Sequence, residues 1–494
     1  MVFLLKWNSM SQAEQALTPF VQGLLNRKGY NVFVEIDNYL DFLFEKGKSI
    51  SIWDLISLHK DEFDGAVCYD LDSENVSINM AATICAAYDF IGVPKELIKK
   101  VNSMGIKTVC DLSEVQGSRA ERQRIVFNAV KDKLSKTALV HQVVKQDNFH
   151  LMLRDFSIYN RWPCVYTDQS DDDRAFRKEV LEFLDRNIPV YGWTDDEISF
   201  VNDVSTYGDY VIPMDWSSNH SYLGKQNCEI KQNVKRTKIK KNKHYISIVV
   251  SDGDNIQWLE RSFAYDSSYG QRQRSSVDYK VSWTFSPSLV KLSPTVAEKL
   301  FKSGKSDYFI SGVSGVGYSN MLAYPIEHLD EFTRQTAHWM KKSDLGVVCL
   351  LDDLRLMGTS ENVCNRLHHY ARFDNIKGGI WELDPDHYRG GHGKIFVSDG
   401  KPFFSVKYSF WHFSGDAANV TKEWIDDFAD EINKLQVSPN TDDGYTVINV
   451  HPWTIEMWAL DYLVSKLDNH IELVYADELI DLYKSNVLRN ARFD

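Results

Sequence analysis

Seven or eight short apolar runs recur between Tyr245 and Glu478, and each ends in a polar or acidic cluster. The runs are rich in β-branched and aromatic residues, as buried parallel strands are, and the stretches between them are long enough for helices. Such βα units, joined by right-handed crossovers, close into a (β/α)7-8 barrel, so we expect a TIM-like barrel here. The runs are YISIVVSDGDN, YKVSWTFSPS, YFISGVSGVGY, GVVCLLDD, GGIWELD, FFSVKYSFWH, YTVINVHPW and IELVYADE.

The polar residues that follow these runs are candidates for an active site. In a TIM barrel the carboxyl ends of the strands carry the active site, because the βα loops there vary without disturbing the packed interior. In chain order these ends carry Asp252 with Asp254 and Asn255, Ser286, Ser314, Asp352 with Asp353, Glu382, Trp411 with His412, His451, and Asp477.

The first half of the chain is also predicted to be α/β, but differently built. A chain of 494 residues exceeds one ordinary core, so two or three domains are expected. Apolar runs alternate with helical stretches at about 13–26, 119–136 and 172–186, which indicates open parallel sheets. We predict an amino-terminal α/β domain (1–145), a second small α/β segment (146–224), an exposed basic linker (225–243) and the barrel domain (244–494).

Charge and composition limit the classes of molecule that the protein could bind. A net charge of -13 argues against a nucleic-acid binder, and no apolar stretch approaches the roughly 20 residues that cross a bilayer. The acidic, aromatic-rich composition suits a carbohydrate or another small polar or cationic substrate. The amino-terminal apolar run is too short for a signal-peptide core, and the seven cysteines form no C-x-x-C pair. These features predict a cytoplasmic protein.

The VVSDGDNIQW segment places Asp252, Asp254 and Asn255 on a tight turn at Gly253, directly after a strand. Two carboxylates at this spacing can hold a sugar's hydroxyls, supply an acid or base, or share a divalent cation. The alternative is an Asx-rich turn that caps the next helix.

A glycine-rich loop follows the third run. Ser314 lies among glycines that include Gly315 and Gly317, and the stretch continues through Tyr318 to Tyr324. Glycines allow a close approach of backbone amides to a ligand, and a tyrosine can stack on a ring. We therefore expect these residues to bind substrate; the alternative is a purely structural turn.

Four segments together resemble the GxGYxYP family of glycoside hydrolase type, over most of the chain and in the same order. They are VQGLLNR, SDGDNIQW, SWTFSPSLVKLSP, and GVGY followed by YP. The resemblance implies an α/β amino-terminal region and a carboxy-terminal domain of the TIM-barrel glycosidase type. This chain departs from the compact motif, because SNMLA separates Tyr318 from Tyr324 where the family pattern has a single residue.

A glycosidase needs a pair of carboxyl groups, one protonated and one ionised, roughly 5 to 10 Å apart. Asp352, Asp353 and Glu382 are candidates to complete a pair with Asp252 or Asp254. Glu382 follows Trp381, and an apolar aromatic neighbour raises the pKa of a carboxyl group toward acid duty. The alternatives are a helix cap or a loop salt bridge.

Aromatic and histidine side chains gather at the same strand ends. Trp381, Trp411 and Trp453 offer flat apolar faces to a sugar ring, although core packing is the alternative for each. His412 and His451 are expected to form hydrogen bonds rather than bind a metal. A predicted hairpin with its turn at Asp399-Gly400 carries Arg389, which could fold over the barrel mouth.

The leading hypothesis is a glycoside hydrolase without a cofactor. One alternative is a deacetylase-like metal-dependent hydrolase, with a divalent ion between Asp252, Asp254 and His451. Another is a non-catalytic carbohydrate-binding or scaffold protein, because one fold hosts many functions. The sequence leaves the oligomeric state open.

Overall fold

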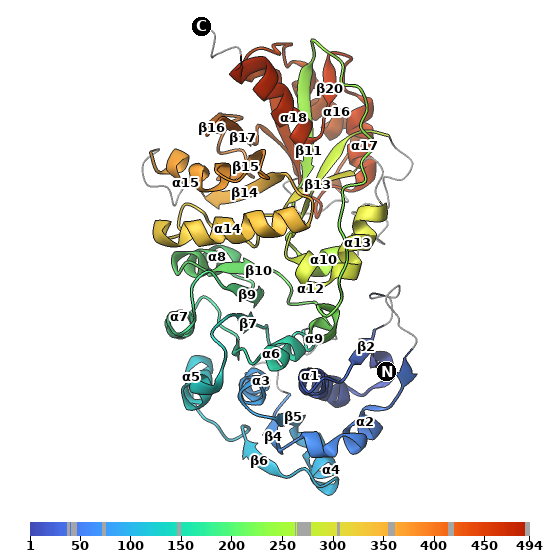
Figure 1. Cartoon of the computed structure of the whole chain (residues 1–494), viewed down its shortest axis with the longest axis vertical. Coiled ribbons are helices and arrows are strands. Elements are labelled where there is room, and N and C mark those ends of the chain that lie inside the picture. Colours follow the sequence, from blue (N-terminus) through green and yellow to red (C-terminus); the bar gives the residue numbers. More distant parts are fainter. Residues whose placement is uncertain are drawn as a thin grey trace. The chain divides into compact units, whose positions relative to one another are not determined.

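The chain forms two compact units, residues 1–227 and 228–494 (Figure 1). The computed structural model describes residues 1–36, 40, 47–71, 76–145, 150–261, 263, 278–303, 307–353, 361–412 and 419–489, with the side chains of 361–364 left out.

The first unit holds three parallel sheets that share one strand order. In each sheet the strand that comes first in the chain lies between the second and the third. This order defines open, doubly wound sheets, as the alternating pattern of the first half predicts. The sheets are β2 (Val32–Glu35), β1 (Phe3–Lys6), β3 (Lys48–Ser49); β5 (Phe90–Pro94), β4 (Gly65–Tyr69), β6 (Thr108–Asp111); and β10 (Tyr210–Ile212), β9 (Pro189–Gly192), β7 (Leu139–His141), β8 (Cys164–Val165).

Helices connect these strands, and their ends follow from local sequence. In α1 (Gln12–Arg27) the Ser11 hydroxyl accepts from the Glu14 N–H and Glu14 returns the bond, which is a capping box. Ser118 and Glu121 form the same box at α5 (Arg119–Val130), which ends before the predicted residue 136. The other helices are α2 (Ile52–Leu58), α3 (Ser77–Ala87), α4 (Ile98–Ser103), α6 (Arg154–Asn160), α7 (Asp171–Phe183), α8 (Glu197–Thr206) and α9 (His220–Leu223).

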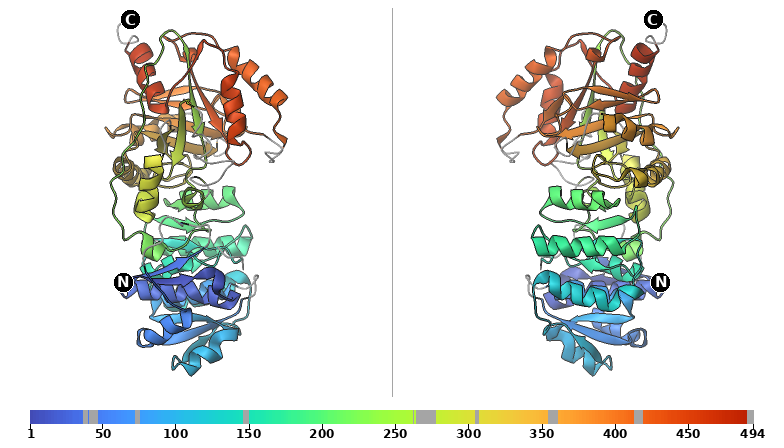
Figure 2. Two further views of the ribbon diagram at one scale, coloured as in Figure 1. Left: turned by 90° about the vertical axis from the view of Figure 1, so that its right-hand side faces the viewer. Right: turned by 90° about the vertical axis from the view of Figure 1, so that its left-hand side faces the viewer.

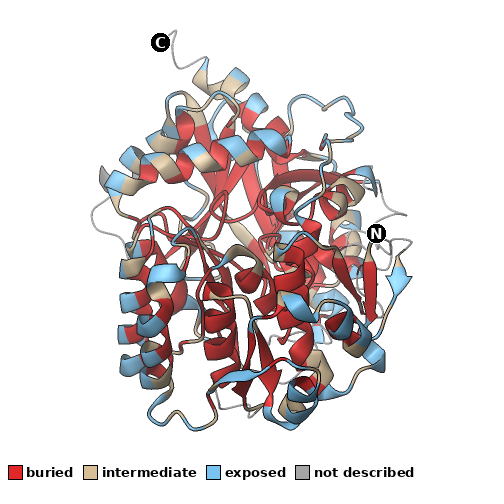
Figure 3. Ribbon diagram, turned by 60° about the horizontal axis from the view of Figure 1, so that its bottom comes forward, coloured by how far each residue is buried: buried red, intermediate tan, exposed pale blue. Residues whose placement is uncertain are grey.

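All eight predicted runs of the second half are strands. The sixth run holds two strands, and with the additional strand β16 (Ile395–Ser398) the runs form a six-stranded and a four-stranded sheet, in which almost all pairs are parallel. The strands are buried and the helices expose one face, so the core of the unit lies around the sheets (Figure 3). The strands are β11 (His244–Val250), β12 (Val281–Phe285), β13 (Asp307–Ser311), β14 (Val347–Asp353), β15 (Gly378–Asp384), β17 (Lys401–Ser405), β18 (Tyr408–Phe410), β19 (Tyr445–Val450) and β20 (Ile471–Leu473).

These strands do not form the closed barrel that the sequence predicts. Among the described residues no ladder joins β13 to β14, so the pairing falls into two sheets. The strand of the eighth run, β20, is also displaced. β19 pairs with β11 directly, and β20 lies on the opposite edge of β11, which it shares with β12. The short β20 therefore does not stand between β19 and β11, where a barrel in chain order would have it.

The helices of the second unit lie outside its strands (Figure 2). In α14 (Ile326–Lys342) Leu329, Phe332, Thr336 and Met340 are buried at helical spacing. No described helix is long and apolar enough to span a membrane. The remaining helices are α10 (Ile256–Glu260), α12 (Leu289–Leu292), α13 (Pro294–Ser303), α15 (Glu361–Ala371), α16 (Lys422–Asn433), α17 (Met457–Ser465) and α18 (Ala476–Tyr483).

The predicted hairpin is confirmed. Strand β16 (Ile395–Ser398) pairs antiparallel with β17, and Asp399 and Gly400 form the two-residue turn with φ of 50° and 72°. Positive φ at both positions is the geometry that an Asp-Gly turn favours.

The basic segment 225–243 has no helix or strand, but part of it packs on the second unit. The Gln232 side chain donates to the Phe309 carbonyl at 2.6 Å, and Arg236 pairs with Asp477 at 2.8 Å. Most of its lysines are exposed, as a like-charge run predicts.

Candidate active site

The Asp252-Gly253-Asp254 turn is fixed to the neighbouring strand by its backbone. The Gly253 N–H donates to the Thr284 hydroxyl at 2.8 Å, and the Ser286 N–H donates to the Gly253 carbonyl at 2.7 Å. A Cβ on Gly253 would lie 1.8 Å from the Thr284 carbonyl oxygen, so only glycine fits. Asp252 itself has a φ of 66°. A non-glycine residue in this left-handed region is strained and persists only where the surrounding structure holds it, and such residues cluster at functional sites.

The Asp252 carboxylate meets groups from the end of β19. The Trp453 indole N–H donates to Asp252 Oδ1 at 2.8 Å, and the Ser251 hydroxyl donates to Oδ2. His451 Nε2 lies 3.9 Å from Oδ2. Burial lowers the pKa of His451, although the charge of Asp252 opposes that shift. Trp453 is 40% exposed, so this corner of the site is open to solvent.

A stack of rings borders the same corner. The His451 and Trp411 rings lie 3.7 Å apart at 4° to one another, and His387 and Tyr388 contact Trp411 from the side. Asp386, His387 and Tyr388 have φ of 79°, 52° and 69°. Three consecutive left-handed residues without a glycine are costly, and here the turn brings two rings onto Trp411.

Sequence reasoning missed His387 and Tyr388. The aromatic and imidazole residues of DHY, directly after the acidic end of β15, were the available signal. Asp and His adopt positive φ more often than most residues, but neither residue type predicts three consecutive left-handed positions.

Glu382 lies on the inner face of β15, below this corner. Its Oε1 accepts from the Asn449 amide at 2.6 Å, and the Cys349 thiol also interacts with this carboxyl group. Burial raises the pKa of Glu382 well above its usual range, and the nearby charges of Asp252 and Asp254 raise it further. Both effects favour the protonated form of this carboxyl group.

The raised pKa of Glu382 was predicted, but its cause differs. Successive strand residues face opposite sides of a sheet, so Trp381 faces away from the Glu382 carboxyl group. Trp381 is buried and donates its indole N–H to Asp352 at 3.0 Å. Trp381 therefore contributes to the outer core rather than to a sugar-binding face.

The same alternation separates Asp352 from Asp353. Leu351 pairs with Glu382 and Asp353 with Asp384, so Asp353 shares the inner face with Glu382. Asp352 lies on the other face, where it accepts from the Leu322 N–H at 2.9 Å as well as from Trp381. Burial raises the pKa of Asp352 to about 7, despite those donors.

The glycine-rich loop is packed by its own contacts. The Ser314 hydroxyl donates to the Ser319 carbonyl at 2.8 Å, and the Ser314 N–H donates to the Gly317 carbonyl at 3.0 Å. Gly315 has a φ of 119°, and a Cβ there would lie 2.4 Å from Thr336. Ser314 is fully buried and also ties the loop to its neighbours, because its hydroxyl accepts from the Leu351 N–H at 3.4 Å and its carbonyl accepts from the Tyr370 hydroxyl at 2.9 Å.

The tyrosines of this loop are also buried. Tyr324 is inaccessible and contacts Phe332, with ring centroids 5.0 Å apart, and Tyr318 is 8% exposed. Arg366 donates to the carbonyls of Met321 and Tyr324. The inserted SNMLA stretch is thus tied to α15, and the loop supports the second unit instead of presenting a stacking face.

The remaining predicted residues lie at the rim. The Asn255 amide donates to the Asp252 carbonyl at 3.4 Å, Arg389 pairs with Asp386 at 2.7 Å, and the His412 ring meets Trp424 at 5.2 Å. Within the described ranges, no three His, Cys, Asp or Glu side chains are grouped to hold a metal ion.

Three family models match the chain. Residues 242–484 match the "GxGYxYP putative glycoside hydrolase C-terminal domain", 137–225 the "GxGYxYP third domain" and 63–131 the "GxGYxYP_N second domain". The fold defines an α/β protein with several mostly parallel sheets. The chain belongs to the GxGYxYP family. The predicted domain boundaries stay predictions.

A solved structure shares the fold. It is described as "a putative hydrolase from Bacteroides thetaiotaomicron VPI-5482" and superposes with a TM-score of 0.83 at 23% sequence identity. The match covers 98% of this chain and 94% of that one. No curated protein matches the sequence significantly.

Proposed function

We propose that this protein is a glycoside hydrolase whose reaction takes place at the carboxyl edge of β11, β15, β18 and β19. One observation carries the proposal. A solvent-reachable carboxylate, Asp252, and a buried carboxyl group with a raised pKa, Glu382, influence one another across this edge. Two carboxyl groups in contrasting environments are what acid-assisted glycosidic cleavage requires.

In this proposal Glu382 donates the proton to the leaving oxygen, because burial and the charges of Asp252 and Asp254 favour its protonated form. Asp252 acts as the second carboxyl group, oriented by the Trp453 indole N–H. Asn449 holds the Glu382 carboxyl group through Oε1. The exposed part of Trp453 and the Trp411 ring supply apolar faces for a sugar, whose identity and linkage stay open.

The test is the release of reducing sugar from a panel of aryl glycosides and polysaccharides. We expect Asp252→Asn and Glu382→Gln each to lower turnover by about 10²- to 10⁴-fold, the usual contribution of an acid or base. Glu331→Gln makes the same chemical change on the surface of α14, where Glu331 pairs only with neighbouring side chains, and it should leave turnover unchanged.

Wild-type turnover in both Asp252→Asn and Glu382→Gln, with folding intact, would overturn the proposal. If EDTA abolishes activity and a divalent ion restores it, the protein is instead a metal-dependent hydrolase. If the wild type binds glycans of the panel and cleaves none, it is a carbohydrate-binding protein.

A further inference from the structure

The first sheet of the amino-terminal unit has a topological switch point. The chain runs from β1 through α1 to β2 on one edge of β1 and then crosses to β3 on the other edge, and α2 follows β3. The loops that follow β1 and β3 diverge, and a crevice opens between them at the carboxyl ends. In open α/β sheets this crevice is where ligands bind.

A cavity of about 520 Å³ occupies this crevice. Its lining comes from the end of β1 and the start of α1 on one side, and from β3 and α2 on the other. The side chains that matter for recognition are Lys6, Glu14, Lys48, Ser49, Trp53 and Asp54. The volume is in the range of small-molecule sites.

Trp53 is the aromatic element of the cavity. Its indole N–H donates to Glu14, and the Lys100 ammonium lies 3.6 Å from its ring centroid. The ring is therefore held at both its edge and one face, although it remains partly exposed. A fixed, partly exposed indole in a crevice is a ready apolar surface for a flat ligand face.

The polar groups of the cavity are balanced in charge. Among the described residues neither Lys6 nor Lys48 pairs with a carboxylate, and both are exposed. Glu14 and Asp54 bring two negative charges and also accept the capping bonds of α1 and α2. Ammonium donors, carboxylate acceptors and hydroxyl groups around an indole favour a neutral ligand with many hydroxyl groups over an ion.

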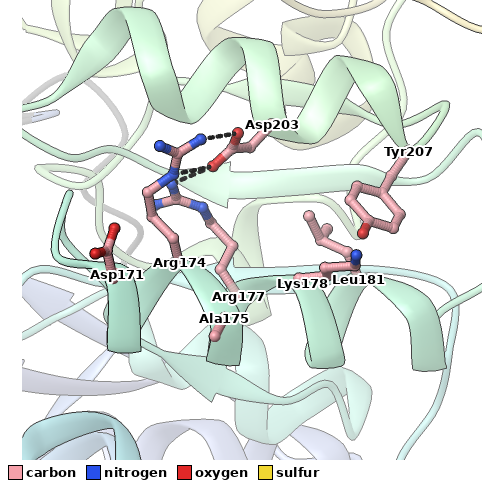
Figure 4. Close-up of a pocket in the computed structure, with 8 residues that line it drawn as sticks. All are labelled: Asp171, Arg174, Ala175, Arg177, Lys178, Leu181, Asp203 and Tyr207. Atoms are coloured by element: carbon pink, nitrogen blue, oxygen red, sulfur yellow. Dashed lines mark hydrogen bonds and ion pairs between the residues drawn. The ribbon is translucent and has the colours of Figure 1, made fainter.

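The third sheet repeats the arrangement. Its order β8-β7-β9 places a cavity of about 360 Å³ after β7 and β9, where Lys145 and Asp195 face one another. The groove between α7 and α8 is different (Figure 4), because its Arg174 and Arg177 both point to Asp203 and are held in ion pairs. That groove also lies on a helical face, away from the strand ends.

We infer that the crevice around Trp53 is a second carbohydrate-binding site, separate from the reaction centre of the second unit. It takes a short neutral oligosaccharide, with a sugar face on Trp53 and hydroxyl groups on Lys6, Lys48 and Glu14. The choice of ligand class rests on the proposed glycoside hydrolase function; the site itself rests on the cavity, the sheet order and Trp53.

Lysine acetylation read by mass spectrometry tests this site locally in the full chain. The probes are tri- to hexasaccharides of glucose, xylose and mannose. We expect a bound oligosaccharide to slow the acetylation of Lys6 and Lys48 in a saturable way, while Lys60, exposed in the same unit but outside the cavity, keeps its rate. Trp53→Ala should raise the half-saturating sugar concentration about tenfold, equivalent to roughly 1.4 kcal/mol.

Trp53→Phe keeps a ring and gives a smaller shift, which separates loss of stacking from loss of fold. Lys48→Gln should weaken protection at Lys6, whereas Lys178→Gln, in the groove of Figure 4, should change neither protection nor turnover. If a high sugar concentration does not protect Lys6 and Lys48 from acetylation and the protein still turns over a glycoside, the second binding site is rejected and the proposed function stands. Protection that depends on Trp53, in a protein that cleaves no glycoside, removes the proposed function and leaves the site.

Discussion

The His451 imidazole lies flat on the Trp411 indole, with ring centroids 3.7 Å apart and planes 4° apart. Two strand ends, those of β19 and β18, are joined by this stack. It also buries the imidazole directly beside Asp252, so the protonation of His451 reports on the state of the proposed reaction centre.

Acid should destabilise the second unit through His451. Burial holds the pKa of His451 below the value of about 6.5 that the unfolded chain has, so the unfolded state binds the proton more tightly. The stabilisation is present above pH 6.5 and is lost as pH falls below it. We expect the melting temperature of His451→Gln to fall less than that of the wild type when the pH is lowered from 7.5 to 5.

His368→Gln is the matched control, since His368 is exposed on α15. A wild type and a His451→Gln variant whose melting temperatures fall in parallel over this range would contradict the prediction.

Glu382→Gln should separate stability from activity. The pKa of Glu382 lies well above the value of about 4.3 in the unfolded chain, so the folded state binds the proton more tightly. Its stabilisation is full below pH 4.3 and is lost as pH rises toward the folded pKa. The urea midpoint of Glu382→Gln should therefore rise relative to that of the wild type from pH 5 to 8, while the variant loses turnover. A variant that loses ground with rising pH would show that Glu382 is ionised.

Much of the second unit could be predicted from its sequence, because strand signals and turn chemistry are local. The eight runs and the Asp399-Gly400 hairpin turn are of this kind. Barrel closure is not local: it depends on where the short β20 inserts, and β20 joins the edge of β11 that also carries β12. The hydrophobic pattern of a sequence predicts where strands end, but it does not predict which strands pair along their edges.

The candidate site was predictable to the level of strand ends and no further. The choice between Asp352 and Asp353 depends on the register of β14 against β15, which one sequence does not reveal. The loop from Ser314 to Tyr324 looks like a binding loop because glycines signal close approach. Here the close approach, at Gly315, is to Thr336 inside the protein.

Asp352→Asn and Asp353→Asn should have opposite effects. Asp352 accepts from two buried donors, and an asparagine would turn an N–H toward one of them, at a cost of about 1–3 kcal/mol in the free energy of unfolding. Turnover per folded molecule should persist. Asp353→Asn, on the Glu382 face, should lower turnover with a smaller effect on stability. Urea unfolding and active-site assays on both variants decide it, and equal losses of turnover would refute the assignment of faces.

Gly253→Ala should disrupt the Asp252-Asp254 turn more than any change of that size elsewhere in the unit. A Cβ at this position meets the Thr284 carbonyl oxygen at 1.8 Å, and backbone cannot move aside as a flexible side chain can. Relief requires the turn to separate from β12 and to lose the two hydrogen bonds that fix it. Overpacking of this kind costs about 1–3 kcal/mol or more, and both carboxylates shift with the turn.

Gly346→Ala is the matched control, because its Cβ would have only ordinary contacts beyond 3.5 Å. We expect its free energy of unfolding to stay within about 0.5 kcal/mol of the wild type, as for other benign substitutions. Gly253→Ala should instead melt earlier and lose turnover even where it is fully folded, and full activity in that variant would show that the turn does not position the reaction.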